Sequence, residues 1–149
     1  LDETARRQRR IELFEPYHDA VKQTLMRLWK RGTPPAILSI HSFSPNFGDE
    51  PRPWDIGVLW NRDPRIAMPL MDMLKARDLN VGDNEPCSGQ QLAYTIDFHG
   101  GAAGLANCVI EINQDQICDT AGIDRWGGIL EEIIPEILKI QSLHLVKPF

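Results

Sequence analysis

The sequence predicts an α/β protein, a three-layer α/β/α sandwich built around a mainly parallel or mixed sheet. Three observations support this: short unbroken apolar runs that suit buried strands, longer stretches with apolar residues at helical spacing, and turn-forming residues between them. We expect strands at about 36–40, 56–60 and 106–112, and helices at about 17–30, 64–77 and 120–141. Strands that alternate with helices in this way form a sheet whose faces the helices cover.

The composition is that of one globular domain and argues against several classes of function. The chain has 149 residues, 42% of them hydrophobic and 25% charged, so we treat 1–149 as a single domain. A net charge of −5 leaves no basic surplus for a general nucleic-acid binder. No apolar run approaches the roughly 20 residues of a membrane span. Three cysteines without metal-ligand spacing favour a reducing, cytoplasmic location.

The chain begins inside a charged, helix-forming stretch, LDETARRQRRIELFE, without an initiator methionine. We therefore expect it to be the C-terminal part of a longer domain, incomplete at its N-terminus. Three strands also make a small sheet for this much helix, which predicts an open sheet edge or face. The missing N-terminal segment, or a second copy of the chain, would cover that surface.

The first α/β unit comprises a helix, a proline-rich turn and a strand. Pro16 marks a break or a helix start, because proline is tolerated in a first turn. One apolar stripe then follows at helical spacing, formed by Val21, Leu25, Leu28 and Trp29. The turn 31–35 ends the helix, and the unbroken apolar run Ala36–Ile40 predicts a strand buried on both faces.

Polar residues follow the first two predicted strands. His41 and Ser42 come directly after the first strand, at the carboxyl end where ligands collect in helix-covered sheets. The second strand is followed by the polar turn 61–65, and a helix begins at Pro64. Arg62 and Arg65 either hold a substrate carboxylate, in the two-pronged geometry that arginine favours, or form surface ion pairs.

The second half of the chain predicts a loop, a short element, a strand and a long helix. Residues 80–91 are rich in turn formers and form a loop long enough to reach over a site. Leu92–Gly104 fits a short helix ended by glycines better than it fits a strand. Glu111 lies inside the third apolar run, where a carboxylate is costly unless it is paired, for example with an arginine, or has a chemical role. Pro135 should kink the closing helix.

His41 and Glu111 are the strongest candidates for chemistry, and the residues alone leave two mechanisms open. In the first, the histidine is a metal ligand and the glutamate activates a metal-bound water. In the second, both residues act as acid–base groups without a metal. The chain has no HExxH motif and no cysteine cluster that would decide between these mechanisms.

Six motifs follow one another along the chain: FEPYHDAV, SIHSFSP, RPWDIGVLWNRD, GDNEP, DFHG and VIEINQD. Together they resemble the N-formylglutamate amidohydrolase family, from about Glu12 to Trp126. The resemblance implies a zinc-dependent amidase with an α/β/α sandwich, related in fold to carboxypeptidases and aspartoacylase. It also implies hydrolysis of an N-acyl amino acid, N-formylglutamate, to formate and glutamate, a step in histidine degradation.

The resemblance implies a role for each site residue. His41 matches a metal-binding histidine, and Glu111 matches the glutamate that serves as general base and acid. Roles in substrate binding are implied for Ser42, Asn61, Arg62 and Asn84. The other zinc ligands of the family lie in the N-terminal segment that we expect to be missing. The alternative is a non-catalytic binding or regulatory domain that keeps the fold without a complete metal site.

Overall fold

The computed structural model describes residues 2–148, apart from the side chains of Gln91 and Leu92. The chain divides into two compact units, residues 1–35 and residues 36–149. Among the described residues, no helix is both long and apolar enough to cross a membrane.

The first unit is helical from Glu3 to Trp29. It contains α1 (Glu3–Arg9), a π-helical turn (Arg10–Phe14) and α2 (Glu15–Trp29). The Asp2 carboxylate caps α1 by accepting a hydrogen bond from the Ala5 N–H at 2.7 Å. Pro16 stands in the first turn of α2, where its missing N–H is tolerated. The helix predicted at 17–30 is therefore confirmed, and helical structure continues through the expected break.

The second unit contains a mixed four-stranded sheet in the order β1-β6-β4-β5. Its strands are β1 (Ile37–Phe43), β4 (Ile56–Leu59), β5 (Val81–Asp83) and β6 (Asn107–Asn113). β6 runs parallel to β1 and antiparallel to β4, which is parallel to β5. All three predicted strands lie in this one sheet. The sequence missed β5, because a three-residue strand with a glycine and an aspartate does not stand out from a turn-rich segment.

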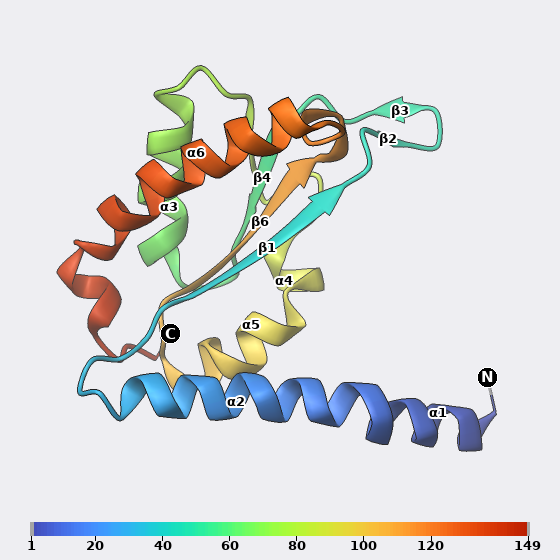
Figure 1. The fold of residues 1–149 in the computed structure, drawn as a ribbon, viewed down its shortest axis with the longest axis vertical. Coiled ribbons are helices and arrows are strands. Elements are labelled where there is room, and N and C mark those ends of the chain that lie inside the picture. Colours follow the sequence, from blue (N-terminus) through green and yellow to red (C-terminus); the bar gives the residue numbers. More distant parts are fainter. Residues whose placement is uncertain (1, 149) are drawn as a thin grey trace. The chain divides into compact units, whose positions relative to one another are not determined.

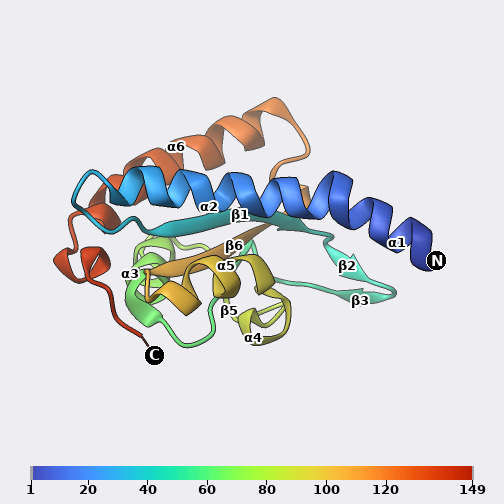
Figure 2. The same cartoon turned by 90° about the horizontal axis from the view of Figure 1, so that it is seen from below.

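A separate antiparallel ribbon, β2 (Asn46–Phe47) with β3 (Glu50–Pro51), extends beyond the ends of β1 and β4 (Figure 2). Its tight connection includes Gly48, whose φ of +61° is a backbone conformation that favours glycine. Three short 3₁₀ turns complete the unit: η2 (Gly101–Ala103), η3 (Gln114–Gln116) and η4 (Gln141–His144).

Helices cover both faces of the sheet, which confirms the three-layer α/β/α arrangement (Figure 1). One face carries α3 (Pro64–Lys75) and α6 (Thr120–Leu138), and the other carries α4 (Gly89–Leu92) and α5 (Tyr94–His99). Successive residues of β6 point to opposite faces, so Cys108 and Ile110 enter one core whereas Val109 enters the other. α5 also confirms the preference for a helix within 92–104.

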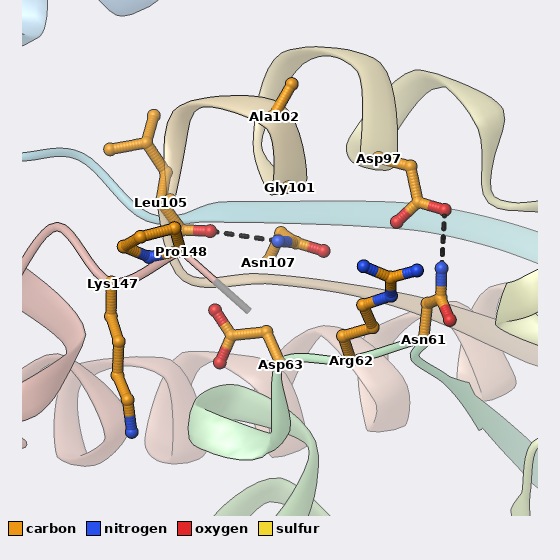
Figure 3. Close-up of a pocket in the computed structure, with 11 residues that line it drawn as sticks. Asn61, Arg62, Asp63, Asp97, Gly101, Ala102, Leu105, Asn107, Lys147 and Pro148 are labelled. Carbon is orange, nitrogen blue, oxygen red and sulfur yellow. Dashed lines mark hydrogen bonds between the residues drawn. The ribbon is translucent and has the colours of Figure 1, made fainter.

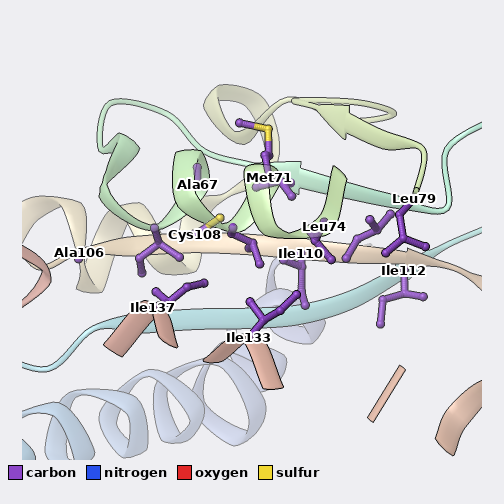
Figure 4. Packing of buried hydrophobic residues seen from close by; sticks show 14 of the residues in the cluster. Ala67, Met71, Leu74, Leu79, Ala106, Cys108, Ile110, Ile112, Ile133 and Ile137 are labelled. Carbon is purple, nitrogen blue, oxygen red and sulfur yellow. The ribbon is translucent and has the colours of Figure 1, made fainter. Parts of the chain in front are cut away.

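The larger core lies between the sheet, α3 and α6 (Figure 4). Its members include Ile56, Val58, Leu70, Leu74, Ile110, Ile133 and Ile137, all less than 5% exposed. Burying one such aliphatic side chain contributes about 1.5–3 kcal/mol to folding. This core fixes β4 and β6 against α3 and α6, and so fixes the strand that carries Glu111.

The description of the first strand needs two corrections. β1 is not buried on both faces: Ile40 is 54% exposed, and among the described residues β1 has a strand neighbour on one edge only. The strand also runs on to Phe43, because its pairing with β6 continues as far as Asn113. His41 therefore lies within the strand, not beyond its end.

Candidate functional site

Glu111 and His41 face each other across the β1–β6 pair. The two residues are partners in the parallel register, and strand alternation places both on the face that α4 and α5 cover. They line one cleft of about 170 Å³ together with Ser39, Tyr94 and Thr95. The structure thus brings the two principal candidates from the sequence into one site.

The cleft changes the proton affinity of Glu111. Burial raises the pKa of this half-buried carboxyl above its usual value, and the charges of His41 and Arg52 offset part of the rise. The Nε2 atom of His41 lies 2.9 Å from the Ser39 hydroxyl, so Nδ1 is the ring nitrogen that this hydrogen bond does not use. A carboxylate with an elevated pKa beside an imidazole can accept a proton and hand it on.

The main chain of the 84–88 loop lies against β4 and β5 beside Glu111. Gly57 pairs with Glu111 on the antiparallel side, and a Cβ atom at Gly57 would overlap the carbonyl oxygen of Glu85. A Cβ atom at Gly82 would lie 2.5 Å from the same oxygen. The two glycines therefore let the loop lie directly on β4 and β5. The loop predicted to reach over a site does approach Glu111.

Asn84 holds this loop in place from within. Its side-chain oxygen accepts hydrogen bonds from the N–H groups of Trp60 at 3.0 Å and Gly89 at 2.9 Å. The backbone of Asn84 has φ of +55°, a conformation that asparagine tolerates better than most residues. Further along, burial raises the pKa of the Cys87 thiol, and the charge of Glu111 raises it further. The hydrogen bonds to Trp60 and Gly89 give Asn84 a structural role within the loop.

Asn61 and Arg62 lie in a different cavity, of about 390 Å³, together with Asp97 and Lys147 (Figure 3). The Asn61 amide donates to the Asp97 carboxylate at 3.0 Å. Asn107 lines this cavity too, four residues before Glu111 on β6, a separation of roughly 13 Å along a strand.

A buried apolar cluster lines the cleft of His41 and Glu111, and none of its members lines the larger cavity. Its members, Leu59, Ala93, Ile96 and Val109, are each at most 6% exposed. The structure therefore does not bring Asn61 and Arg62 together with His41 and Glu111.

Ser42 and Arg65 also lie away from the cleft. Ser42 follows His41 in the strand and so points to the opposite face, where its hydroxyl is 3.4 Å from the Gln114 amide nitrogen. Arg65 forms an ion pair with Asp63, and the two side chains are only 7% and 5% exposed. Arg65 thus forms the ion pair that the sequence allowed, but in the interior and not on the surface.

The donor set of the cleft suits zinc in kind but not in number. Histidine nitrogen and carboxylate oxygen are ordinary zinc ligands, yet a catalytic zinc needs three protein ligands. Within the part of the chain that the structure describes, no group of three or more His, Cys, Asp or Glu side chains could hold a metal ion. The described residues alone therefore do not complete a zinc site.

Comparison with known proteins identifies the family. Residues 1–118 match the family model for N-formylglutamate amidohydrolase. The chain belongs to the N-formylglutamate amidohydrolase family. All six motifs that indicated this family in the sequence lie within residues 1–118. The expected range of the resemblance, from about Glu12 to Trp126, extends a few residues beyond this match.

One solved structure supports the fold assignment. A crystal structure of a gene product from Agrobacterium tumefaciens has a TM-score of 0.84 and 28% sequence identity with this chain. The match covers 93% of this chain but 56% of that one, so this chain spans little more than half of the neighbour's length. No curated protein matches the chain.

Sequence reasoning for this amidohydrolase-family chain did not single out three features in or near the cleft. Ser39 could have been found, because it lies two residues before His41 and so on the same face of the strand. The pair Gly57 and Gly82 and the position of Arg52 had no such signal. Both depend on where the 84–88 loop and the β2–β3 ribbon return to the sheet.

Proposed function

We propose that the protein to which this chain belongs hydrolyses the amide bond of an N-acyl acidic amino acid such as N-formylglutamate. The observation that carries this proposal is the pairing of a half-buried Glu111 with His41 in one cleft of an amidohydrolase-family fold. This chain spans little more than half of the length of the similar solved structure, so the activity is proposed for the whole protein.

Glu111 is the proposed proton carrier. Burial raises the pKa of Glu111, so its carboxylate holds a proton more readily than an exposed glutamate does. The carboxylate removes a proton from water as the water oxygen bonds to the acyl carbon. The same proton then passes to the departing amine nitrogen as the carbon–nitrogen bond breaks, so Glu111 ends the cycle ionised again.

We also propose zinc as the cofactor, with His41 supplying one ligand and the others coming from outside the described residues. Zinc supplies Lewis acidity, which polarises an amide carbonyl and acidifies water towards a pKa of about 7. The proposal includes a cytoplasmic location and a place in histidine degradation. Among the described residues, the three cysteine thiols are free, which agrees with a reducing compartment.

Glutamine at position 111 tests the proposal in the full-length protein. Glu111→Gln keeps the size and polarity of the side chain but removes the base, so we expect kcat to fall about 10²- to 10⁴-fold. Metal content, measured by mass spectrometry, should not change. Glu131→Gln is the matched control, because Glu131 is an exposed carboxylate on α6, over the opposite face of the sheet.

Two outcomes would contradict the proposal. A Glu111→Gln enzyme that works at the normal rate would remove Glu111 from the chemistry. A wild-type full-length protein that hydrolyses no N-acyl amino acid would favour the alternative of a non-catalytic domain.

A further inference from the structure

One further pair of residues lies beyond His41 and Glu111 on the same face of the sheet. Phe43 lies two residues after His41, Asn113 lies two residues after Glu111, and these two residues are partners in the β1–β6 register. Because side chains two positions apart share a face, Phe43 and Asn113 form the next rung on the cleft side. That rung is roughly 7 Å from the His41–Glu111 pair.

Arg52 places a positive charge at this rung. Its guanidinium carbon lies 6.0 Å from the centre of the Phe43 ring and 5.1 Å from that of Phe47. The backbone of Arg52 is fixed as well, since its N–H donates to the Pro45 carbonyl at 2.8 Å. The Asn113 amide donates to the Trp54 carbonyl at 3.0 Å, which anchors the same segment to β6. Arg52 is therefore held beside the Phe43–Asn113 rung.

The charge of Arg52 acts on the cleft and is not neutralised by an ion pair. The guanidinium lowers the pKa of both Glu111 and Cys87, against the effect of burial on each group. None of the ion pairs among the described residues involves Arg52, whereas Arg65 pairs with Asp63. Aromatic rings stabilise a guanidinium by contact and leave its N–H groups able to bind a carboxylate through two hydrogen bonds.

We infer that Arg52 binds the side-chain carboxylate of the substrate and so makes the cleft selective for acidic amino acids. This inference rests on the proposed function, because it assumes that the amide bond lies at Glu111. In N-formylglutamate five bonds of about 1.5 Å separate the formyl carbon from the side-chain carboxyl carbon, roughly 6 Å when extended. That length matches the spacing of roughly 7 Å between the His41–Glu111 pair and the Phe43–Asn113 pair.

Arg62 fits this task less well. It lines the other cavity, which shares no lining residue with the cleft of His41 and Glu111. The inference therefore assigns substrate selectivity to Arg52, in the segment before β4, and not to Arg62, in the turn after β4.

The test compares two substrates that differ only in the side-chain carboxylate, N-formylglutamate and N-formylglutamine. For the full-length enzyme we expect kcat/KM to favour the acidic compound about 10- to 100-fold, the range for a charge-assisted hydrogen bond. In Arg52→Gln this preference should fall close to one, through a higher KM for N-formylglutamate with little change in kcat. Arg52→Lys keeps the charge and should retain part of the preference.

Arg125→Gln is the matched control. Arg125 also lies over an aromatic ring, 5.8 Å from the centre of Trp126, but on α6, which covers the opposite face of the sheet. Its replacement removes an arginine–aromatic contact without touching the cleft, so the substrate preference should stay at the wild-type value. A preference lost in Arg125→Gln as well would show that the effect is structural and would overturn the assignment.

Binding measurements separate failure of this inference from failure of the proposed function. Titration calorimetry with both compounds on the Glu111→Gln protein and on its Arg52→Gln double variant reports recognition without turnover. Tighter binding of N-formylglutamate that depends on Arg52 supports the inference even if the wild-type protein hydrolyses neither compound. Undiminished preference in Arg52→Gln, or equal binding of both compounds by the Glu111→Gln protein, overturns the inference while leaving the hydrolase proposal to its own test.

Discussion

The neighbours of Glu111 explain how a carboxylate is tolerated in the middle of a strand. On one side its partner is His41, whose positive charge favours the ionised carboxylate. On the other side its partner is Gly57, which has no side chain, so the 84–88 loop occupies that space. The carboxyl group is thus partly shielded from water without a salt bridge that would fix it as a carboxylate, and its pKa is raised.

Stability should depend on pH through Glu111. Because the folded protein raises the pKa of Glu111, it favours the protonated form. The stabilisation from Glu111 is complete below the unfolded-state pKa and is lost as pH rises through the folded-state value. Glu111→Gln removes this loss, so the variant should gain stability relative to wild type at about pH 7 and much less at about pH 4.

Urea unfolding of both proteins at the two pH values measures this difference. A stability difference that is equal at both values, or larger in acid, would mean that the fold does not raise the pKa of Glu111. The Glu131→Gln variant should show no such dependence, because its carboxylate is exposed.

At the scale of elements, the 84–88 loop packs main chain against main chain beside Glu111. The loop reaches β4 and β5 only because Gly57 and Gly82 have no Cβ atom. Asn84 then ties the loop to the turn after β4 through its two hydrogen bonds. The position of the loop is therefore set by three residues.

Alanine at position 57 tests the packing of the 84–88 loop on β4. The added methyl group meets the backbone oxygen of Glu85, which cannot rotate away, so Gly57→Ala should cost about 1–3 kcal/mol of folding free energy. Gly127→Ala on α6 is the control, because a Cβ atom there meets nothing within 4 Å. Alanine in that helix should be neutral or stabilising by up to about 1 kcal/mol. Equal effects of the two substitutions in denaturant unfolding would contradict the close approach of the loop.

At the scale of the whole molecule, distant parts of the second unit meet at Arg65. Its guanidinium donates to the carbonyl oxygens of Leu145 at 2.6 Å and Gly104 at 3.0 Å while it pairs with Asp63. The Asp63 carboxylate also caps α3 by accepting from the Arg65 N–H at 3.0 Å. One buried ion pair thus joins the start of α3 to the turn before β6 and to the C-terminal segment.

Removal of Asp63 should leave Arg65 buried without its counter-charge. We expect Asp63→Ala to cost about 3–5 kcal/mol, because an unpaired buried charge is strongly unfavourable. Glu136→Ala is the control, since it breaks the Lys139–Glu136 pair, whose side chains are 70% and 54% exposed. Exposed pairs contribute about 0–1 kcal/mol. Thermal and urea unfolding of both variants would distinguish the two costs, and a small effect of Asp63→Ala would mean that the pair is not buried in solution.

The sequence predicted those parts of the molecule in which local pattern and tertiary structure agree. Apolar runs located three of the four strands of the main sheet, and a carboxylate inside such a run drew attention to Glu111. The sequence did not predict β5, because its pairing with β4, and not its own residues, makes it a strand. Arg62 was a candidate as a cation beside a strand end, but it lines a cavity other than the cleft. Arg52 reaches the cleft only through the course of the β2–β3 ribbon, which no local pattern reveals.

The close packing of the 84–88 loop has a consequence for redesign near the cleft. The loop meets β4 and β5 as backbone at Gly57 and Gly82, so no side chain can be shortened there to make room. The lining of the cleft is different, because Tyr94 and Thr95 of α5 border it with side chains. A catalyst for bulkier acyl groups would therefore be sought by trimming those two positions, or by changing the length of the 84–88 loop.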